Sequence, residues 1–259
     1  MRYLIIFLLL VTVASCSAKK EWKLVWYDEF DYTGLPDSSR WTAEVGGHGW
    51  GNNELQFYTA GRQENARVAN GLLTIEARKE KRDSMNFTSA RLVTKNKGDW
   101  QYGKIDVKAK LPKGLGTWPA IWMLASTTPL NWPDDGEIDI MEHVGFNQGF
   151  IHGSIHSKKY NHVIGTQKTD TIHIPDCSEK FHTYSVEWDK DSVRVGVNGN
   201  YYFRFGNEHA GYDAWPFDNK MHLLLNIAVG GNWGGQKGVD ENIWPQKMEI
   251  DYVRVYQQQ

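Results

Sequence analysis

The sequence has very little cysteine and almost no net charge. Its 259 residues include only two cysteines, Cys16 and Cys177, which are too few for a disulfide framework. The formal net charge is −2 at pH 7, so the charge balance does not argue for nucleic acid or an acidic polymer as a partner. Internal repeats and low-complexity blocks are also missing, and a chain of this length can bury one large core. These absences favour one globular domain.

The only marked apolar run lies at the N-terminus. Residues 4–13 follow a basic Met-Arg start and are too few to span a bilayer, which is typical of an export signal. The run ends in Val-Ala-Ser-Cys, which resembles a bacterial lipobox and implies cleavage before Cys16 and acylation of that residue. Cys177 would then have no disulfide partner. The alternative is an ordinary secretory signal in which Cys16 is incidental.

The lipobox resemblance divides the chain into three parts. We expect a lipoprotein signal peptide over residues 1–15, a tether over residues 16–20 and a catalytic domain over residues 21–259. The mature protein would be exported and held by its lipid alone to a bacterial membrane, expected to be the outer one, facing the periplasm or the cell surface.

Tryptophan is the abundant residue type. Twelve tryptophans suit a β fold that stacks sugars on indole rings, because the chain shows few helical patterns. Strand patterns recur at short spacing, and Asn-Gly pairs at positions 70–71 and 198–199 predict tight turns. Many short strands predict a β-sandwich or jelly roll. We expect strands at residues 22–26, 72–77, 103–111, 120–124, 192–203, 221–228 and 248–256, and one short helix near residues 207–211.

One strand pattern carries three carboxylates. Residues 135–143 read Asp-Gly-Glu-Ile-Asp-Ile-Met-Glu-His, so Glu137 and Asp139 share one face of the predicted strand. Glu142 falls on the opposite face unless a β-bulge at residue 140 or 141 returns it. A solvated strand face is the alternative interpretation, but no basic residue between positions 132 and 143 balances the charge. Clustered acids of this kind favour a glycosidase, with one ionised and one protonated carboxyl group.

The acidic stretch resembles a known family. Residues 137–142, Glu-Ile-Asp-Ile-Met-Glu, are similar to the active-site signature of glycoside hydrolase family sixteen, in the form whose extra Met marks the bulged strand. The resemblance covers about residues 22–256. It implies an all-β, concanavalin A-like jelly-roll sandwich of two curved antiparallel sheets with a concave substrate cleft. It also implies a retaining mechanism in which Glu137 is the nucleophile, Glu142 the acid/base and Asp139 an assistant.

Four further stretches match the laminarinase-like members of that family. Residues 50–59 imply that Asn53 binds a sugar hydroxyl and that Glu54 is structural. Residues 89–95 imply a glycone-subsite role for Arg91. Residues 116–124 imply sugar stacking by Trp118 and Trp122, which lie four apart and so on the same face of a strand. A Gly-rich turn at residues 230–235 displays one more tryptophan that no flanking side chain could bury, which favours a sugar platform. The candidate substrate-binding residues are therefore Asn53, Arg91, Trp118, Trp122 and Trp233.

The nine histidines give little support for a metal site. His152 and His156 share a strand face, but a zinc site needs a third ligand that the spacing does not supply. The resemblance implies that His156 forms hydrogen bonds near the leaving-group subsite. His143 should face away from Glu142 into the protein, and His182 lies in an alternating strand pattern typical of a structural residue.

The resemblance implies no cofactor for catalysis, but it allows one structural calcium ion. Its candidate ligands are Glu29, Gly71 and Asp251, on the convex side of the sandwich. The partner expected is a laminarin-like β-glucan, cut internally by a monomeric endo-β-1,3-glucanase. Two alternatives stay open at this point, a β-1,3-1,4-glucanase of the same family and a non-catalytic β-glucan-binding lectin.

Overall fold

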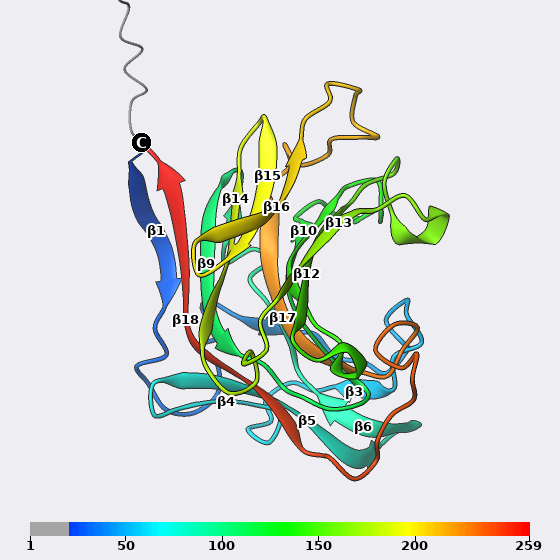
Figure 1. Cartoon of the computed structure of the whole chain (residues 1–259). Helices are drawn as coiled ribbons and strands as arrows, with labels where there is room; N and C mark the ends of the chain where they lie inside the picture. Colours follow the sequence, from blue (N-terminus) through cyan, green and yellow to red (C-terminus); the bar gives the residue numbers. More distant parts are fainter. Residues whose placement is uncertain (1–20) are drawn as a thin grey trace, which may run out of the picture.

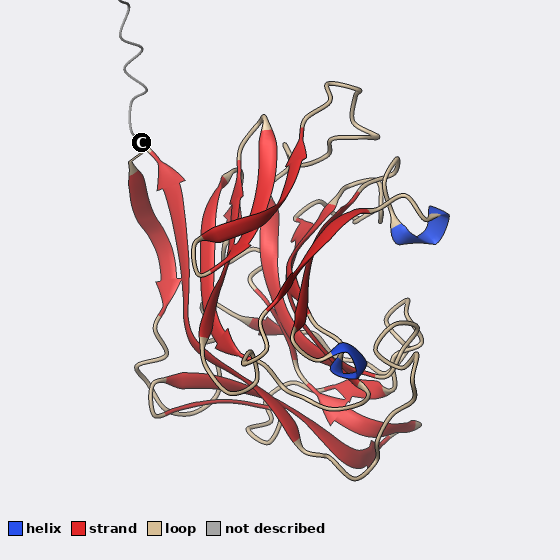
Figure 2. Ribbon diagram, in the orientation of Figure 1, coloured by secondary structure: helices blue, strands red, loops and turns tan. Residues whose placement is uncertain are grey.

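The computed structural model describes residues 21–259, so the predicted signal peptide, the tether and Cys16 lie outside the described residues. Within that range the chain forms two stacked sheets, as Figures 1 and 2 show. No helix of the described part has the length and apolar character needed to cross a membrane.

The first sheet has ten strands in the order β16-β15-β14-β9-β18-β5-β6-β3, with β1 beside β18 and β4 beside β5. All its pairs are antiparallel except β3 with β6. The bounds are β1 Trp22–Asp28, β3 Gln56–Tyr58, β4 Ala66–Ala69, β5 Leu72–Arg82, β6 Met85–Ser89, β9 Gly103–Lys110, β14 His182–Trp188, β15 Ser192–Val197, β16 Asn200–Gly206 and β18 Gln246–Gln258.

The second sheet has eight strands in the order β13-β12-β11-β10-β17-β7-β2, with β8 beside β17. Figure 1 shows β10, β12 and β13 of this curved sheet to the right of β9, β14 and β18 of the ten-stranded sheet. The bounds are β2 Thr42–Ala43, β7 Arg91–Val93, β8 Asp99–Trp100, β10 Thr117–Ala125, β11 Glu137–Glu142, β12 Phe150–His156, β13 Lys168–His173 and β17 Met221–Val229.

One large apolar core lies between the sheets, and period-two patterns supply it. Ile105, Val107 and Ala109 of β9 are fully buried, as their alternation predicts. The predicted strands are all present, and both Asn-Gly pairs adopt positive φ at both residues, as a tight hairpin turn requires. The all-β sandwich prediction is therefore confirmed.

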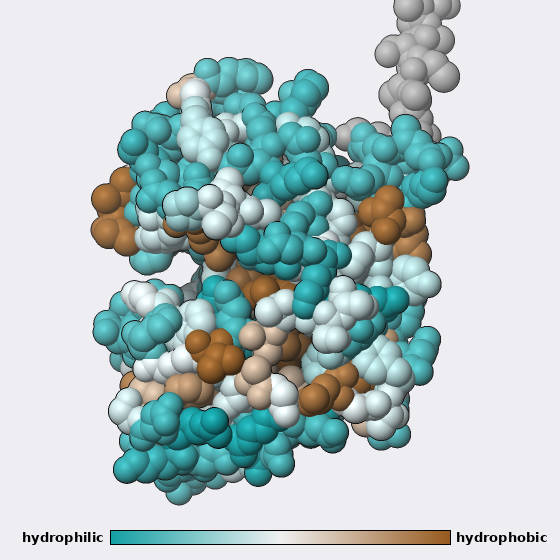
Figure 3. Space-filling model, turned by 180° about the vertical axis from the view of Figure 1, so that it is seen from behind, coloured by the Kyte–Doolittle hydropathy of each residue, from teal (hydrophilic) through white to brown (hydrophobic). Residues whose placement is uncertain are grey.

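The predicted helix near residues 207–211 is wrong. His209 and Gly211 have φ values of 54° and 86°, and such left-handed residues interrupt a right-handed helix. Two single 3-10 turns, η1 (Gly145–Asn147) and η2 (His162–Ile164), form where no helix was expected. Figure 3 views the molecule from behind and shows a notch at its left edge, on the side where η2 lies in Figure 1.

Candidate active site

The predicted β-bulge is present in β11. On one side Ile121 pairs with Met141 and Trp122 with Asp139, so Ile140 has no partner on β10. On the other side Asp139 pairs with Ser154 and Glu142 with His152, so two residues of β11 face one of β12. The extra residue turns Glu142 to the face that carries Glu137 and Asp139, while Ile138, Ile140 and Met141 are fully buried in the core.

Glu137 is held from two directions. The indole Nε1 of Trp132 donates a hydrogen bond to Oε2 of Glu137 at 2.7 Å. On β12, Nε2 of His156 lies 3.9 Å from Oε1 of Glu137 and 3.2 Å from Oδ2 of Asp139. His156 therefore lies beside the two acids, where the resemblance implied a hydrogen-bonding residue.

Glu142 has its own indole donor. Trp118 on β10 donates from Nε1 to Oε1 of Glu142 at 3.0 Å. Trp118 in turn packs edge-on against Trp233, with ring centroids 5.6 Å apart. Each of the two glutamates thus accepts one charge-assisted hydrogen bond from a tryptophan, which favours its ionised form.

Burial acts against ionisation of all three acids. Burial, followed by the charge of Asp139, raises the pKa of Glu137 to about 8. Burial and the charge of Glu137 raise the pKa of Glu142 to about 7. Asp139 is 1% exposed, and burial with the charge of Glu142 raises its pKa well above the usual range. The cluster therefore retains protons near neutral pH, which is the condition for a carboxyl group to act as a general acid.

Arg91 lies between two indole rings on the same side of the sheet. Its guanidinium carbon is 4.7 Å from the ring centroids of both Trp50 and Trp122, and its Nε contacts Oε2 of Glu44 at 2.5 Å. Trp122 also donates to Oδ1 of Asn226 at 2.7 Å. Trp118 and Trp122 thus share a face of β10 with the acids of β11, as their equal parity predicted.

Asn53 and Trp233 come from neighbouring loops. Asn53 donates from Nδ2 to Oδ1 of Asn232 at 2.8 Å, next to Trp233 in the chain. Glu54, by contrast, is 6% exposed and accepts hydrogen bonds from Gln56 and Tyr58, which agrees with a structural role.

Trp233 is partly buried by residues that do not flank it in the chain. Trp118 and the ring of His152 pack against it edge-on, at 5.6 and 4.9 Å between ring centroids. The residue as a whole is partly buried, and these two rings are distant from it in sequence. A sugar-stacking role for Trp233 stays a prediction.

His143 and His182 are structural, as expected. His143 is fully buried and accepts a hydrogen bond at Nε2 from the backbone N–H of Gly149 at 3.1 Å. Burial lowers the pKa of His143 to about 4. His182 contacts Asn198 through Nδ1 and Asp176 through Nε2, at 2.9 and 3.0 Å.

His156, the histidine that could bind a metal ion, lies beside two of the three acids. Glu137, Asp139 and His156 bring ligand atoms within 4.8 Å of one another, the one such group within residues 21–259. The sequence spacing of His152 and His156 did not reveal these two further ligands, because strand pairing brings them from β11. The same carboxyl groups are the candidates for catalysis, so a metal ion there would compete with substrate.

Of the three candidate calcium ligands, Glu29 and Asp251 are paired with cationic side chains, and Gly71 has no carboxylate. Both Glu29 oxygens accept from Arg254 at 2.7 and 2.8 Å, and Asp251 pairs with Lys108 at 2.7 Å. Gly71 could offer only its backbone carbonyl. Calcium would have to displace two cations or bind backbone oxygens, so the carboxylates as arranged do not fit a calcium site.

Sequence reasoning missed Trp132, Trp50 and Asn226. Trp132 belongs to the loop before β11, and only its path through space brings the indole to Glu137. Trp50 was included in a matched stretch without a role, and it stacks on Arg91. Asn226 on β17 bonds both Trp122 and the hydroxyl of Tyr58. An asparagine in an otherwise apolar central strand is the one sequence signal that could have pointed to it.

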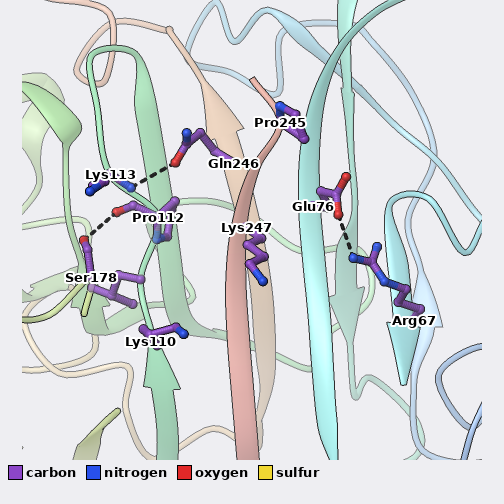
Figure 4. Close-up of a pocket in the computed structure, with 10 residues that line it drawn as sticks. Arg67, Glu76, Lys110, Pro112, Lys113, Ser178, Pro245, Gln246 and Lys247 are labelled. Atoms are coloured by element: carbon purple, nitrogen blue, oxygen red, sulfur yellow. Dashed lines mark hydrogen bonds and ion pairs between the residues drawn. The ribbon is translucent and has the colours of Figure 1, made fainter. Parts of the chain in front are cut away.

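A separate hollow of about 470 Å³ lies on the other sheet and does not include these residues. Figure 4 shows it between β4, β5, β9 and β18, with Arg67 paired to Glu76 and Lys113 bonded through its N–H to Gln246. Its charges are largely paired within the protein, and none of the three acids lines it.

Comparison with known proteins agrees with this geometry. The family model described as "Glycosyl hydrolases family 16" matches residues 53–254, which include all three acids. A β-glucanase of Rhodothermus marinus is 54% identical over 243 residues, covering 91% of this chain and 85% of the relative. The crystal structure of the laminarinase from Rhodothermus marinus superposes with a TM-score of 0.91 at 52% identity, covering 93% of this chain and 99% of that one.

A second solved structure, SCLam, is described as a non-specific endo-β-1,3(4)-glucanase. It superposes with a TM-score of 0.88 at 51% identity, and 92% of each chain is covered. The family match spans most of the chain and the relatives are covered almost end to end. The chain therefore belongs to glycosyl hydrolase family 16.

Proposed function

We propose that this protein is a retaining endo-β-1,3-glucanase, a laminarinase, that hydrolyses internal β-1,3-glucosidic bonds. The observation that carries the proposal is the β11 bulge, which brings Glu137 and Glu142 to one face, each with an indole donor. The relatives named as β-glucanase and laminarinase support the substrate class. The family resemblance implies an open cleft on the concave sheet, and such a cleft suits attack in the middle of a polymer rather than at its end.

Two carboxyl groups divide the reaction between them. Glu142 protonates the glycosidic oxygen while Glu137 attacks the anomeric carbon, and this releases the leaving chain and forms a glycosyl-enzyme. Glu142, now ionised, takes a proton from water, which attacks the same carbon and frees Glu137. The pKa of Glu142, raised to about 7, lets it hold the proton that the first step needs.

Asp139 assists Glu137, its neighbour on the same face of β11, and His156 Nε2 lies within 3.9 Å of both carboxyl groups. Both groups have raised pKa values, so the pair holds a proton near neutral pH. The nucleophilic role requires that this proton reside on Asp139, where it can be donated to the Glu137 carboxylate. His156 and the Trp132 indole favour this arrangement because both lower the pKa of Glu137.

The glucan chain would be held by aromatic and amide side chains around the acids. Trp118, Trp122 and Trp233 offer indole surface to the apolar faces of glucose rings. Asn53 and Arg91 offer further hydrogen-bond donors, although Asn53 already bonds Asn232 and Arg91 is already held by Glu44. No redox or nucleotide cofactor takes part in this chemistry.

The experiment is reducing-sugar release by the purified mature domain on laminarin, barley mixed-linkage glucan and agarose, beside Glu137→Ala. The proposal expects release from laminarin that the variant abolishes. Release from mixed-linkage glucan alone would change the bond specificity to the β-1,3-1,4 alternative. Silence on all three with laminarin binding retained would identify a lectin.

Binding by Glu142→Gln separates enzyme from lectin independently. In a hydrolase this variant loses turnover and keeps its affinity for laminarin oligosaccharides, because the neutral amide preserves shape. A lectin has no turnover to lose.

We also infer from the lipobox-like sequence that the mature protein is an exported lipoprotein, anchored through Cys16. Separately, we propose that it acts as a monomer. Radiolabelled palmitate should label the wild-type protein in a bacterial host but not Cys16→Ser. Light scattering of the mature domain should give the mass of one chain.

The calcium prediction is tested by adding Ca²⁺ and measuring Tm, which should rise if a structural ion binds.

A further inference from the structure

The loop before the catalytic strand is tied down by one carboxylate. Asp135 lies in the connection between β10 and β11, and its Oδ2 accepts hydrogen bonds from Thr127 Oγ1 at 2.9 Å and the Asn131 N–H at 2.7 Å. These bonds close the loop upon itself around Trp132. Asp135 therefore determines the shape of the segment that carries the indole donor of Glu137.

The same carboxylate joins a second loop, which follows β16. Tyr212 donates its hydroxyl hydrogen to Oδ1 of Asp135 at 3.0 Å. Asn219 donates to the Tyr212 oxygen at 2.6 Å and to the Asp135 backbone carbonyl at 3.3 Å. A Cβ on Gly136 would meet the ring of Pro216 at 2.8 Å, so the backbone at Gly136 also packs closely against this second loop.

Trp132 is the residue that this arrangement fixes. Its ring lies 5.2 Å from the ring of His162 on η2, and its Nε1 bonds Glu137 at 2.7 Å. Trp132 also packs against the apolar cluster of Val93, Leu124 and Leu224. An indole held at only one side could turn away from the carboxylate. The bonds of Asp135 stabilise the loop on the other side of the ring.

We propose that Asp135 and Tyr212 form a strap across two loops that positions Trp132 on Glu137, so that both are positioning residues for the nucleophile. Neither touches a reacting atom. The proposal rests on the proposed function in that Glu137 is the nucleophile. Loosening the strap weakens the indole hydrogen bond, and Glu137 then ionises less readily.

Several other charged groups face Glu137 and stay unchanged in the test. They are Asp139 and Glu142 on β11 and His156 on β12, with His162 beyond Trp132. On the strap itself, Asp134 pairs with Lys158 at 3.6 Å. Substitutions at positions 135 and 212 leave all of these in place.

The test compares Asp135→Asn, Tyr212→Phe and Trp132→Phe with the wild type. Asparagine has one acceptor oxygen where aspartate has two, so one side of the strap is lost. Tyr212 is 49% exposed, so its phenylalanine variant should fold normally. Tyr27, 47% exposed on β1 of the other sheet, supplies the control variant Tyr27→Phe, which should behave as wild type.

Two readouts are used. The first is the ratio of kcat/KM at pH 5 to kcat/KM at pH 9 on laminarin, which falls when the pKa of the nucleophile rises and is insensitive to uniform losses. We expect a fall of roughly three- to tenfold in Trp132→Phe and a smaller fall in the two strap variants. The second is the pKa of Glu137 from carboxyl ¹³C NMR, expected to rise in the same order.

A double variant decides whether the strap acts through the indole. If it does, Asp135→Asn adds nothing to the ratio or the pKa once Trp132 is Phe. Additive effects, or strap variants with wild-type pKa and ratio, would overturn the proposal. A wild-type protein inactive on every glucan would instead contradict the proposed function, and the NMR result would still decide the strap.

Discussion

The indole Nε1 of Trp118 lies 3.0 Å from Oε1 of Glu142, and this bond opposes the burial that keeps Glu142 protonated. Burial raises the pKa of Glu142 to about 7, and the indole lowers it from what burial alone would produce. The same opposition is found at Glu137 with Trp132. Two tryptophans thus lower the pKa of the two glutamates that we propose as nucleophile and acid/base.

Trp118→Phe should make the enzyme relatively more active at high pH. Removing the N–H donor raises the pKa of Glu142, so the acid keeps its proton at higher pH. We expect the ratio of kcat/KM at pH 9 to kcat/KM at pH 5 to increase by roughly three- to tenfold, the equivalent of about half to one pKa unit.

The matched control is Trp122→Phe, whose indole donates to Asn226 rather than to an acid. Its pH ratio should stay at the wild-type value, whatever happens to KM. A fall in the ratio for Trp118→Phe would mean that Glu142 acts in its ionised form in the first step.

Glu142→Gln should stabilise the folded protein at pH 8 but not at pH 4. The folded-state pKa is raised from 4.5 to about 7, so the native state binds the proton more tightly than the unfolded chain. The stability penalty is absent below pH 4.5, grows through the window up to pH 7 and is complete above it. A gain of about 1–3 kcal/mol is expected at pH 8, measured as Tm and converted with the calorimetric enthalpy.

Glu80→Gln is the control of opposite sign. The hydrogen-bonded pair with Arg62 lowers the pKa of Glu80 to about 2, so its stabilisation is present above pH 4.5 and is lost as pH falls toward 2. This variant should therefore lower Tm at pH 8. Equal Tm for wild type and Glu142→Gln across the whole range would show that Glu142 ionises without penalty.

Gly153→Ala should damage activity through the bulge. Gly153 lies on β12 between the partners of Asp139 and Glu142, and a Cβ there would come within 2.9 Å of both the Tyr202 hydroxyl and Val195. Relieving this contact moves β12 away from the bulge and displaces Glu142. We expect a loss of at least tenfold in kcat and about 1–3 kcal/mol in the free energy of unfolding.

Gly206→Ala on β16 supplies the comparison, because a Cβ there meets nothing within 4 Å. It should keep wild-type activity and stability. Full activity in Gly153→Ala would show that the bulge tolerates movement of β12.

The sheets and the acidic face were predictable because they depend on local patterns. Period-two alternation in β9, the Asn-Gly turns and the three acids of β11 are all visible within a few residues. The bulge followed from the mismatch between strand parity and the position of Glu142. These features need no knowledge of distant contacts.

The surroundings of the acids were less predictable because they depend on pairs far apart in sequence. Trp132 reaches Glu137 through a loop that Tyr212 fixes from 77 residues away. Trp233 packs against Trp118 and His152, neither of which flanks it. The wrong prediction of a helix near residues 207–211 has a local cause, because His209 and Gly211 adopt left-handed φ values.

The most direct test of the account is the anomeric form of the product. Laminarin hydrolysis followed by ¹H NMR from the first seconds should show the β-anomer of the new reducing ends before mutarotation, and Glu137→Ala should release none. This result would establish double displacement at Glu137. First appearance of the α-anomer, or hydrolysis by Glu137→Ala, would contradict the proposed nucleophile and the mechanism built on it.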